Sequence, residues 1–130
     1  MTRTHETEIR VRYQETDNMG VVYYANYLVW FEVARTEYLR VLGISYRELE
    51  KDGFYLMVAE VECKYKSPAR YDDVVRIETW ISEMKNSSLT FEYKLFADER
   101  LLATGSSAHV FTNKAGKPVR MPGAIKNLAG

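Results

Sequence analysis

The segment YQETDNMGVVYYANYL, residues 13–28, brings a carboxylate, a glycine and the start of a helical pattern close together. Asp17 supplies the carboxylate, and Gly20, which lacks a Cβ, permits a positive φ and lets a ligand approach the main chain closely. A helix that begins between Val22 and Asn26 leaves its first N–H groups unpaired at the positive end of its dipole. Acyl-transfer hydrolysis needs such donors for the developing oxyanion, with a carboxylate as nucleophile or as base for water.

The same residues also suit an ordinary turn. Asp, Asn and Gly are frequent turn formers, and residues 16–20 stand between a strand pattern and a helix pattern. Local composition by itself therefore favours a structural turn, and the spacing alone does not decide between the two interpretations.

A long helix is predicted directly after this segment. From residue 26 to residue 42 apolar side chains recur at steps of three and four, and Gly43 follows where a helix C-cap is expected. The apolar stripe is wide, so the helix is expected to be buried on more than one side. A second, shorter helix is predicted over residues 45–52, with Ser45 as N-cap and Glu48 completing a capping box.

Alternating polar and apolar residues predict β-strands on both sides of these helices. The predicted strands are residues 8–13, 59–66, 74–82, 89–96 and 101–111. Short polar turns at residues 85–87 and 98–100 suit hairpins, which predicts an antiparallel meander for the last three strands. In the strand over residues 59–66, Val61, Cys63 and Tyr65 are expected to face inward.

The small residues Ala103, Gly105 and Ser107 share one face of the last strand, which lets the long helix approach the sheet closely. A helix that is apolar on most of its circumference needs a concave partner, so we expect an antiparallel five-stranded sheet wrapped around one long central helix. The predicted fold class is α+β, with residues 1–130 forming a single domain. Residues 124–130 are predicted to form at most a short terminal helix.

Composition argues against several classes of protein. The 18 basic and 18 acidic residues cancel, which gives no indication of nucleic acid as a partner. No apolar run is long enough for a membrane span and the N-terminus has no apolar signal-peptide core, so a cytoplasmic protein is expected. The single cysteine, Cys63, fits a reducing compartment. His5 and His109 stand in unrelated contexts, so no metal site is predicted.

The wider sequence changes the weight of the two interpretations of Asp17. YQETDNMGVVYYANYLVWFEVARTEYLR and SPARYDDVVRIET, with the spacing Asp17-x-x-Gly20-x-Val22-Tyr23-x-x-Asn26-Tyr27, resemble the hot-dog fold acyl-CoA thioesterases. The similar branch contains 4-hydroxybenzoyl-CoA thioesterase and the short acyl-CoA thioesterase associated with the Tol-Pal system, and the resemblance extends from about residue 8 to about residue 122. It implies dimers that form one continuous sheet, active sites between subunits, and Asp17 as the catalytic carboxylate.

One position departs from the family pattern. Many members have Val-Tyr-His-Ala where this sequence has Val22-Tyr23-Tyr24-Ala25, so a histidine that could act as acid or orienting donor is absent. The backbone N–H of Tyr24 remains as a donor at the helix start. The change is expected to affect substrate preference more than activity.

Three other side chains are candidates for chemistry. Glu32, on the long helix, is the second choice for the catalytic carboxylate because related enzymes can place the acid there, although pairing with Arg35 at i,i+3 is the favoured interpretation. His109 is predicted to be a surface or hydrogen-bonded structural histidine. Cys63 is predicted to be a buried small apolar residue rather than a nucleophile.

Side chains that could hold a substrate fall into two groups. The predicted acyl pocket is formed by Tyr23, Tyr24, Tyr27 and Trp30, with Asn26 beside them. Candidates for binding coenzyme A are Lys64, Lys66, Arg70, Lys114, Lys117 and Arg120, with Ser87 and Ser88 as further hydrogen-bonding groups. For any one of the basic residues, solvated surface charge is the simpler interpretation.

Together these features predict an acyl-CoA thioesterase that hydrolyses a short-chain or aromatic acyl-CoA without a metal or redox cofactor. Asp17 is the predicted nucleophile or general base, and N–H groups near Val22 to Tyr24 are the predicted oxyanion hole. A homodimer is predicted as the minimum unit and a homotetramer as the assembly. Two alternatives stay open: a hot-dog dehydratase acting on a 3-hydroxyacyl thioester, which asks for a histidine across from an acid, and a non-catalytic acyl-CoA binding module.

Overall fold

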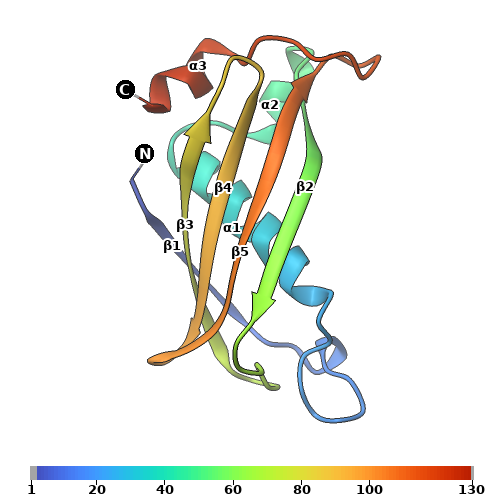
Figure 1. The fold of residues 1–130 in the computed structure, drawn as a ribbon, viewed down its shortest axis with the longest axis vertical. Helices are drawn as coiled ribbons and strands as arrows, with labels where there is room; N and C mark the ends of the chain where they lie inside the picture. The colour runs from blue at the N-terminus through green and yellow to red at the C-terminus, as the bar shows by residue number, and fades with distance from the viewer. Residues whose placement is uncertain (1–2, 130) are drawn as a thin grey trace.

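The structure is a computed structural model that describes residues 3–129. Met1, Thr2 and Gly130 lie outside the described residues, and Gly130 is also the last residue of the predicted terminal helix. One antiparallel sheet forms most of the molecule, and the long helix α1, Asn26–Val41, crosses one face of it (Figure 1). The predicted α+β fold is confirmed.

The sheet has five strands in the order β1-β3-β4-β5-β2, and all neighbouring strands are antiparallel. The strands are β1 (His5–Arg10), β2 (Tyr55–Tyr65), β3 (Val74–Met84), β4 (Ser88–Ala97) and β5 (Arg100–Thr112). The hairpin turns between β3 and β4 and between β4 and β5 fall where the sequence predicted them. Because β2 ends the series, it has a neighbouring strand on one side only.

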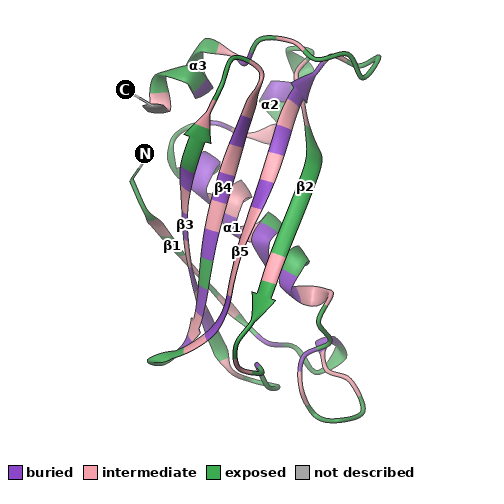
Figure 2. Cartoon of the chain, viewed as in Figure 1, coloured by how far each residue is buried: buried purple, intermediate pink, exposed green. Residues whose placement is uncertain are grey.

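Helix α1 packs on the sheet through one face. Its buried residues recur at steps of three and four: Tyr27, Trp30, Phe31, Ala34, Tyr38 and Leu39. Leu28, Val29 and Glu32, on the opposite face, are exposed, so the predicted burial on more than one side is wrong for the single chain (Figure 2). The apolar stripe is wide because apolar residues also occupy part of the exposed face.

Gly105 lets α1 approach the sheet as closely as the small residues of β5 predicted. A Cβ at this position would lie 2.6 Å from the carbonyl oxygen of Glu62 and would overlap the ring of Phe31. The Phe31 ring is fully buried and stacks on Tyr93, with ring centroids 4.1 Å apart. At this point α1 therefore packs directly against the backbone of β5, and any side chain at position 105 would push the helix away.

The first strand ends earlier than predicted. β1 stops at Arg10, and the N–H of Val11 then donates to the carbonyl oxygen of Asp73 (2.9 Å). Tyr13–Glu15, predicted in part as strand, forms a 3-10 helix. Polar and apolar residues still alternate through this stretch, so the pattern gave no sign that pairing with β3 had ended.

The face of β2 that carries Cys63 points toward α1, as predicted: Cys63 packs against the core, and the Tyr65 ring contacts that of Tyr27 on α1. This face is only partly buried, because Val61 and Tyr65 are exposed and Cys63 is half-buried, so the predicted burial of Cys63 is wrong. β2 also begins at Tyr55, before the predicted start at residue 59. An edge strand has one neighbour only, so a correct alternation need not lead to burial.

The short helices form where the sequence predicted them, although within the described residues no hydrogen bond from the Ser45 N–H to the Glu48 carboxylate completes the predicted capping box. Helix α2, Tyr46–Lys51, has Ser45 as its N-cap, because the Ser45 Oγ accepts a hydrogen bond from the N–H of Glu48 (3.1 Å). The chain closes with α3, Gly123–Lys126, and a 3-10 helix, Asn127–Ala129.

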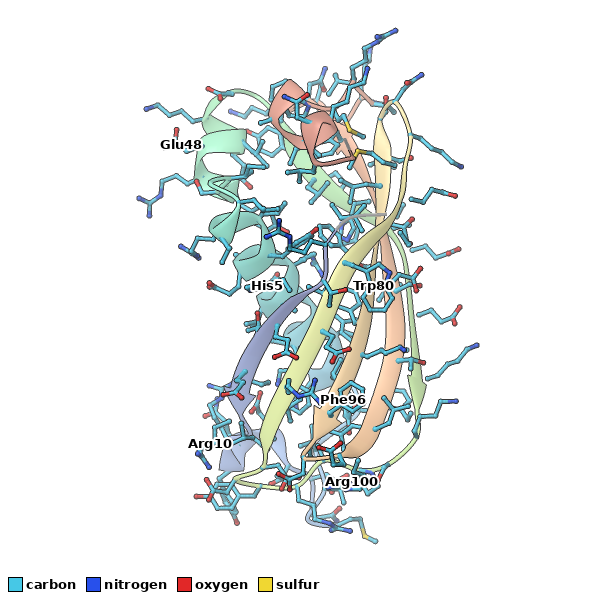
Figure 3. All side chains as sticks on the ribbon, turned by 90° about the vertical axis from the view of Figure 1, so that its left-hand side faces the viewer. His5, Arg10, Glu48, Trp80, Phe96 and Arg100 are labelled. Atoms are coloured by element: carbon cyan, nitrogen blue, oxygen red, sulfur yellow. The ribbon has the colours of Figure 1, made fainter. Side chains whose placement is uncertain are left out.

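The face of the sheet away from α1 is mostly polar. Figure 3 shows Trp80 and Phe96 on the far side of β3 from α1. The guanidinium of Arg76 lies over the Phe96 ring, 4.5 Å from its centroid, and also bonds to Glu78 (2.6 Å). A charged group thus covers the Phe96 ring, which suits a face in contact with water.

We expect Gly105→Ala to destabilise the fold, because neither the Glu62 backbone nor the stacked Phe31 ring has room to move. Overpacking of this kind costs about 1–3 kcal/mol. Urea denaturation followed by fluorescence measures the change. Gly123→Ala is the matched control, since a Cβ there meets no atom within 4 Å. Equal stability of the two variants would show that α1 does not depend on this close approach.

Candidate active site

The loop between β1 and α1 is closed at its base. Thr16 pairs with Val22 in an isolated bridge, and the N–H of Asp17 donates to the carbonyl oxygen of Val21 (2.8 Å). Gly20 has φ of 81°, a conformation that favours glycine, and its N–H donates to the carbonyl oxygen of Asp17 (3.1 Å). A Cβ at Gly20 would meet no atom within 4 Å, so the turn needs glycine for its φ rather than for space within the chain.

The Asp17 carboxylate shapes the turn with one oxygen only. Its Oδ1 accepts hydrogen bonds from the N–H groups of Met19 (2.8 Å) and Val21 (3.4 Å). Its Oδ2 accepts no hydrogen bond from any residue that the structure describes. The turn interpretation and the chemical interpretation of Asp17 are therefore compatible, since the second oxygen stays available.

The N–H groups at the start of α1 are not equally available. The N–H of Val22 donates to Ala69 O (2.8 Å) and that of Tyr23 to Glu15 O (2.9 Å), so both are already used. The N–H groups of Tyr24 and Ala25 donate to no residue between 3 and 129, and no side chain caps α1. Of the N–H groups near Val22 to Tyr24 that the sequence proposed as an oxyanion hole, the one that is free is Tyr24.

The peptide planes that carry these two N–H groups are held in place. The carbonyl oxygen of Tyr23 accepts a hydrogen bond from the N–H of Asn26 (3.0 Å), and that of Tyr24 accepts one from the Tyr65 hydroxyl (3.0 Å). In a trans peptide the N–H points opposite to the preceding carbonyl. Both free donors therefore have fixed directions.

Asp17 and Tyr24 lie at one cavity of about 380 Å³. The residues that line it are Asp17, Val21, Val22, Tyr24, Tyr27, Tyr65, Lys66, Ser67 and Pro68. It opens at the end of the sheet where β2 finishes, beside the loop drawn in blue at the bottom of Figure 1. The cavity thus combines a carboxylate, a free backbone donor and three tyrosine rings.

Two of these tyrosines form a fixed aromatic wall. The rings of Tyr27 and Tyr65 meet edge to face, with centroids 5.0 Å apart, and the Tyr27 hydroxyl accepts the N–H of Ala69 (3.1 Å). Burial, followed by its contact with Cys63, raises the pKa of Tyr65 to about 12. Burial also raises the pKa of Tyr27. Both phenols stay protonated at physiological pH and serve as hydrogen-bonding walls.

Glu15 was not among the predicted site residues, yet it is a charged residue that is only 5% exposed. Its Oε1 accepts the N–H of Arg12 (2.8 Å), and its Oε2 accepts the indole N–H of Trp30 (3.0 Å). Burial of the carboxylate opposes ionisation, but the hydrogen bonds from Arg12 and Trp30 outweigh it and lower the pKa of Glu15. An acid three residues after the start of this turn, at Glu15, could have suggested the first of these bonds, because such a carboxylate can reach back to the N–H of Arg12.

Three aromatic or amide residues predicted at the pocket lie elsewhere. Trp30 is buried beneath the loop and bonds to Glu15, so its predicted place in the acyl pocket is wrong. Asn26 donates through Nδ2 to the carbonyl oxygen of Glu15 (2.9 Å) and is used structurally. Tyr23 is exposed and lies outside the set that lines the cavity; its ring contacts that of Tyr24 at a tilt, with centroids 4.8 Å apart.

Glu32 does not meet the cavity. It is exposed on α1, on the side that faces away from the sheet. The pairing of Glu32 with Arg35 is also wrong, because Arg35 directs its guanidinium to the hydroxyl of Tyr93 (3.5 Å) and forms no ion pair within the described residues. Helical spacing brings the two side chains within range, but Arg35 turns toward the sheet.

The predicted coenzyme A residues divide between the two ends of the sheet. Lys66 lines the cavity, and Arg70 pairs with Val21 in a bridge beside it. Lys64 forms an ion pair with Glu62 (3.6 Å) on the strand surface. Ser87 and Arg120 lie at the opposite end, where the β3–β4 hairpin and the late loop meet through a hydrogen bond from Met121 N–H to Asn86 O (2.9 Å) (Figure 1). Within one chain, Ser87 and Arg120 do not reach the cavity.

Neither histidine lines the cavity. His109 is 1% exposed, and its Nε2 forms a hydrogen bond with Ser107 Oγ (2.7 Å), as the structural interpretation predicted. Burial and the nearby charge of Arg35 lower the pKa of His109 to about 3, so this side chain stays neutral. His5 stacks on Tyr38, with centroids 6.1 Å apart.

Residues 3–129 contain no group of three or more His, Cys, Asp or Glu side chains arranged to hold a metal ion. No described helix combines the length and the apolar character needed to cross a membrane.

A five-stranded antiparallel sheet packed on one long helix matches the fold of solved hot-dog thioesterase structures. A model of the thioesterase-like superfamily matches residues 11–128. The chain is 40% identical over 121 residues to the acyl-CoA thioesterase YbgC of Haemophilus influenzae, which covers 91% of this chain and 88% of that protein. It is 37% identical over 115 residues to the putative acyl-CoA thioesterase YneP of Bacillus subtilis, with 87% and 83% covered.

A solved structure gives the same result. The DHNA-CoA thioesterase from Staphylococcus aureus superimposes with a TM-score of 0.87 at 37% identity, covering 90% of this chain and 80% of that chain. The chain therefore belongs to the thioesterase-like superfamily, a family of thioester hydrolases. The family predicted from residues 13–40 and 67–79 is confirmed.

We expect Glu15→Gln to be less stable than the wild type at neutral pH and this difference to shrink in acid. The pKa of Glu15 is lowered in the fold from its ordinary value of 4.5, so its contribution is present above pH 4.5 and is lost as the pH falls through the folded value. Hydrogen bonds to a charged group contribute about 1.5–3 kcal/mol each. Urea titrations between pH 7 and pH 3 measure the difference.

The control for this titration is Glu37→Gln. Glu37 forms an exposed ion pair with Arg40 (3.3 Å), which contributes little to stability. A difference between the wild type and Glu15→Gln that stays constant down to pH 3 would contradict an ionised Glu15 in the folded state.

Proposed function

We propose that this protein is an acyl-CoA thioesterase that hydrolyses a short-chain or aromatic acyl-CoA to the free acid and coenzyme A. The observation that carries the proposal is that Asp17, whose Oδ2 accepts no hydrogen bond within residues 3–129, lines the same cavity as Tyr24, whose N–H is unpaired there. Nucleophilic attack at a thioester needs these two groups together, one to supply or activate the nucleophile and one to stabilise the oxyanion. The names of YbgC and YneP support the same activity.

In the proposed reaction the thioester oxygen accepts hydrogen bonds from the N–H of Tyr24, and from that of Ala25 where the pose allows. Asp17 then either attacks the carbonyl carbon, giving an anhydride that water cleaves, or removes a proton from a water that attacks directly. Either route breaks the C–S bond, adds one water and releases the acid and the thiol of coenzyme A. The proposed reaction uses no metal or redox cofactor.

The aromatic wall limits the acyl group. The cavity volume of about 380 Å³ is at the small end of ligand sites, and rings of Tyr24, Tyr27 and Tyr65 line it. Planar or short acyl groups fit against such rings, since aromatic pairs favour edge-to-face and offset contacts. Tyr24, which stands where relatives often have histidine, contributes an aromatic surface instead of a titrating side chain.

A second copy of the chain completes the proposed site. β2 is an edge strand of 11 residues with exposed apolar side chains at Met57, Val58, Val61 and Tyr65. A long edge of this kind is a template for pairing, and a twofold axis would join two β2 strands antiparallel into one continuous sheet. Such pairing places Tyr65 of one copy near the other copy's Tyr55.

The same pairing accounts for the predicted residues at the far end of the chain. Ser87 and Arg120 lie at the end of the sheet where β2 begins, while the cavity lies where β2 finishes. In an antiparallel dimer, the partner's Ser87 and the partner's Arg120 come toward the cavity. Together with Lys66 and Arg70 they form the proposed surface for the phosphates of coenzyme A.

We expect Asp17→Asn to lower turnover by about 10²–10⁴-fold, the range for loss of a general base or nucleophile. An Asn side chain still accepts the Met19 and Val21 N–H groups through its amide oxygen, so the turn stays intact. Release of free thiol from a panel of aliphatic and aromatic acyl-CoAs measures turnover. Asp17→Ala, which removes the turn bonds as well, is the comparison for stability.

The same panel separates the alternatives. A dehydratase alters the acyl chain without releasing thiol, and a binding module does neither. Unchanged thiol release from Asp17→Asn would contradict the role of Asp17, and no release from any substrate by the wild type would contradict the proposed function.

We expect Val61→Lys to dissociate the proposed dimer. Val61 is near the middle of β2, and like charges brought together across a twofold axis cost several kcal/mol, which is a rise of about a hundredfold or more in the dissociation constant. Light scattering after size exclusion measures the mass and also tests the predicted tetramer. Val41→Lys, at an exposed valine at the end of α1, is the matched control. An unchanged mass for Val61→Lys would contradict pairing through β2.

A further inference from the structure

We propose that Glu15 is a positioning residue for thioester hydrolysis, because its side chain fastens the Asp17 loop to α1 and so sets the distance between Asp17 and the N–H of Tyr24. The inference rests on the proposed function. Glu15 does not line the cavity, so it touches neither the substrate nor the reacting atoms. It acts through Asp17, two residues further along the chain.

The carboxylate of Glu15 joins two separate segments. Oε1 accepts the N–H of Arg12, whose guanidinium is 3.6 Å from the same oxygen, and Oε2 accepts the indole N–H of Trp30 on the second turn of α1. Arg12 is the charged group that faces this carboxylate, while α1 contributes the neutral indole. A buried carboxylate that loses one of these donors is left with an unsatisfied charge, which is costly. The loop cannot leave α1 without that loss.

The main chain of Glu15 fastens the other end of the loop. Its carbonyl oxygen accepts both the N–H of Tyr23 (2.9 Å) and the Nδ2 of Asn26 (2.9 Å). Glu15 therefore fixes the position of the chain just before Asp17 and also that of Tyr23, which precedes the Tyr24 donor. The tip of the loop between these points is exposed at Asn18, Met19 and Gly20.

A carboxylate suits this position better than an amide. Both oxygens of Glu15 accept hydrogen bonds, and the donors are an amide N–H and an indole N–H that have no acceptor function. A glutamine can satisfy one donor, but its own NH₂ group then faces the other. Glu15→Gln therefore removes one bond and sets two donors against each other with almost no change of volume.

The test is a double-mutant cycle with Asp17→Asn, measured as kcat and KM for thiol release. We expect Glu15→Gln to lower kcat by about 10–100-fold with KM within about threefold, because a displacement near 1 Å of a reacting group costs about 10²-fold. In the Asp17→Asn background the same change should have an effect below about threefold, since groups that act as a unit are not additive. Glu37→Gln is the control with a neutralised carboxylate elsewhere on the chain.

Trp30→Phe provides a second variant in case Glu15→Gln does not fold. It keeps an aromatic ring and removes the indole N–H, so it should lower kcat in the same direction by a smaller factor. All rates are measured well below the thermal midpoint of each variant. An equal fold-change of Glu15→Gln in the presence and absence of Asp17 would overturn the proposal, because it would indicate a general loss of structure.

A spectroscopic readout separates this inference from the proposed function. The chain has two tryptophans, so its ¹H–¹⁵N spectrum contains two indole signals. Glu15→Gln should shift the Trp30 signal and leave that of Trp80, on the far side of the sheet, unchanged. A wild type that releases no thiol while the Trp30 signal responds would end the proposed function only. A Trp30 signal that does not respond would overturn the positioning role.

Discussion

A buried carboxylate has to be fully hydrogen-bonded, and this requirement at Glu15 organises the end of the molecule that carries the cavity. The donors come from Arg12 and from Trp30, so the segment that follows β1 and the helix α1 cannot be placed independently. The loop between them has its two ends fixed at one residue, and Asp17 and the start of α1 meet as a result. The carboxylate of Asp17 then completes the turn with one oxygen and keeps the other free.

The position of α1 is fixed in turn by its packing on the sheet. Phe31 packs between the backbone at Gly105 and the ring of Tyr93, where no larger residue fits on β5. Further along the helix, Arg35 contacts the Tyr93 hydroxyl, which bonds to Ser107, which bonds to His109. This polar network lies in the core between α1 and β5, and the charge of Arg35 helps to keep the pKa of His109 low. A rigid seat gives the free N–H groups at the helix start a defined place relative to Asp17.

The edge strand β2 contributes both to the cavity and to the proposed dimer interface. It supplies Tyr65, whose hydroxyl holds the Tyr24 carbonyl, and it also carries the exposed apolar residues through which we propose that two chains pair. A single chain therefore contains the carboxylate and the donor, but only part of the basic surface predicted for coenzyme A. The separation of Lys66 and Arg70 from Ser87 and Arg120 follows from the antiparallel order of the sheet.

The sequence by itself determined the main elements of this protein. Periods of two and of three to four residues located the strands and α1, Ser45 marked the start of α2, and the spacing from Asp17 to Tyr27 identified the family. These features are local, because each depends only on residues that are close together in the sequence.

Tertiary structure decided which side chains meet. Periodicity marks the face of an element but not its partner, so Trp30 was assigned to a pocket when it supports a buried carboxylate, and Glu32 was paired with an arginine that turns to Tyr93. The same limit applied to β2. Its polar and apolar side chains alternate as predicted, but the strand lies at the edge of the sheet, so its apolar side chains stay largely exposed. Glu15 was missed because its donors come from Arg12 and from a residue 15 positions later, and only folding brings both to one carboxylate.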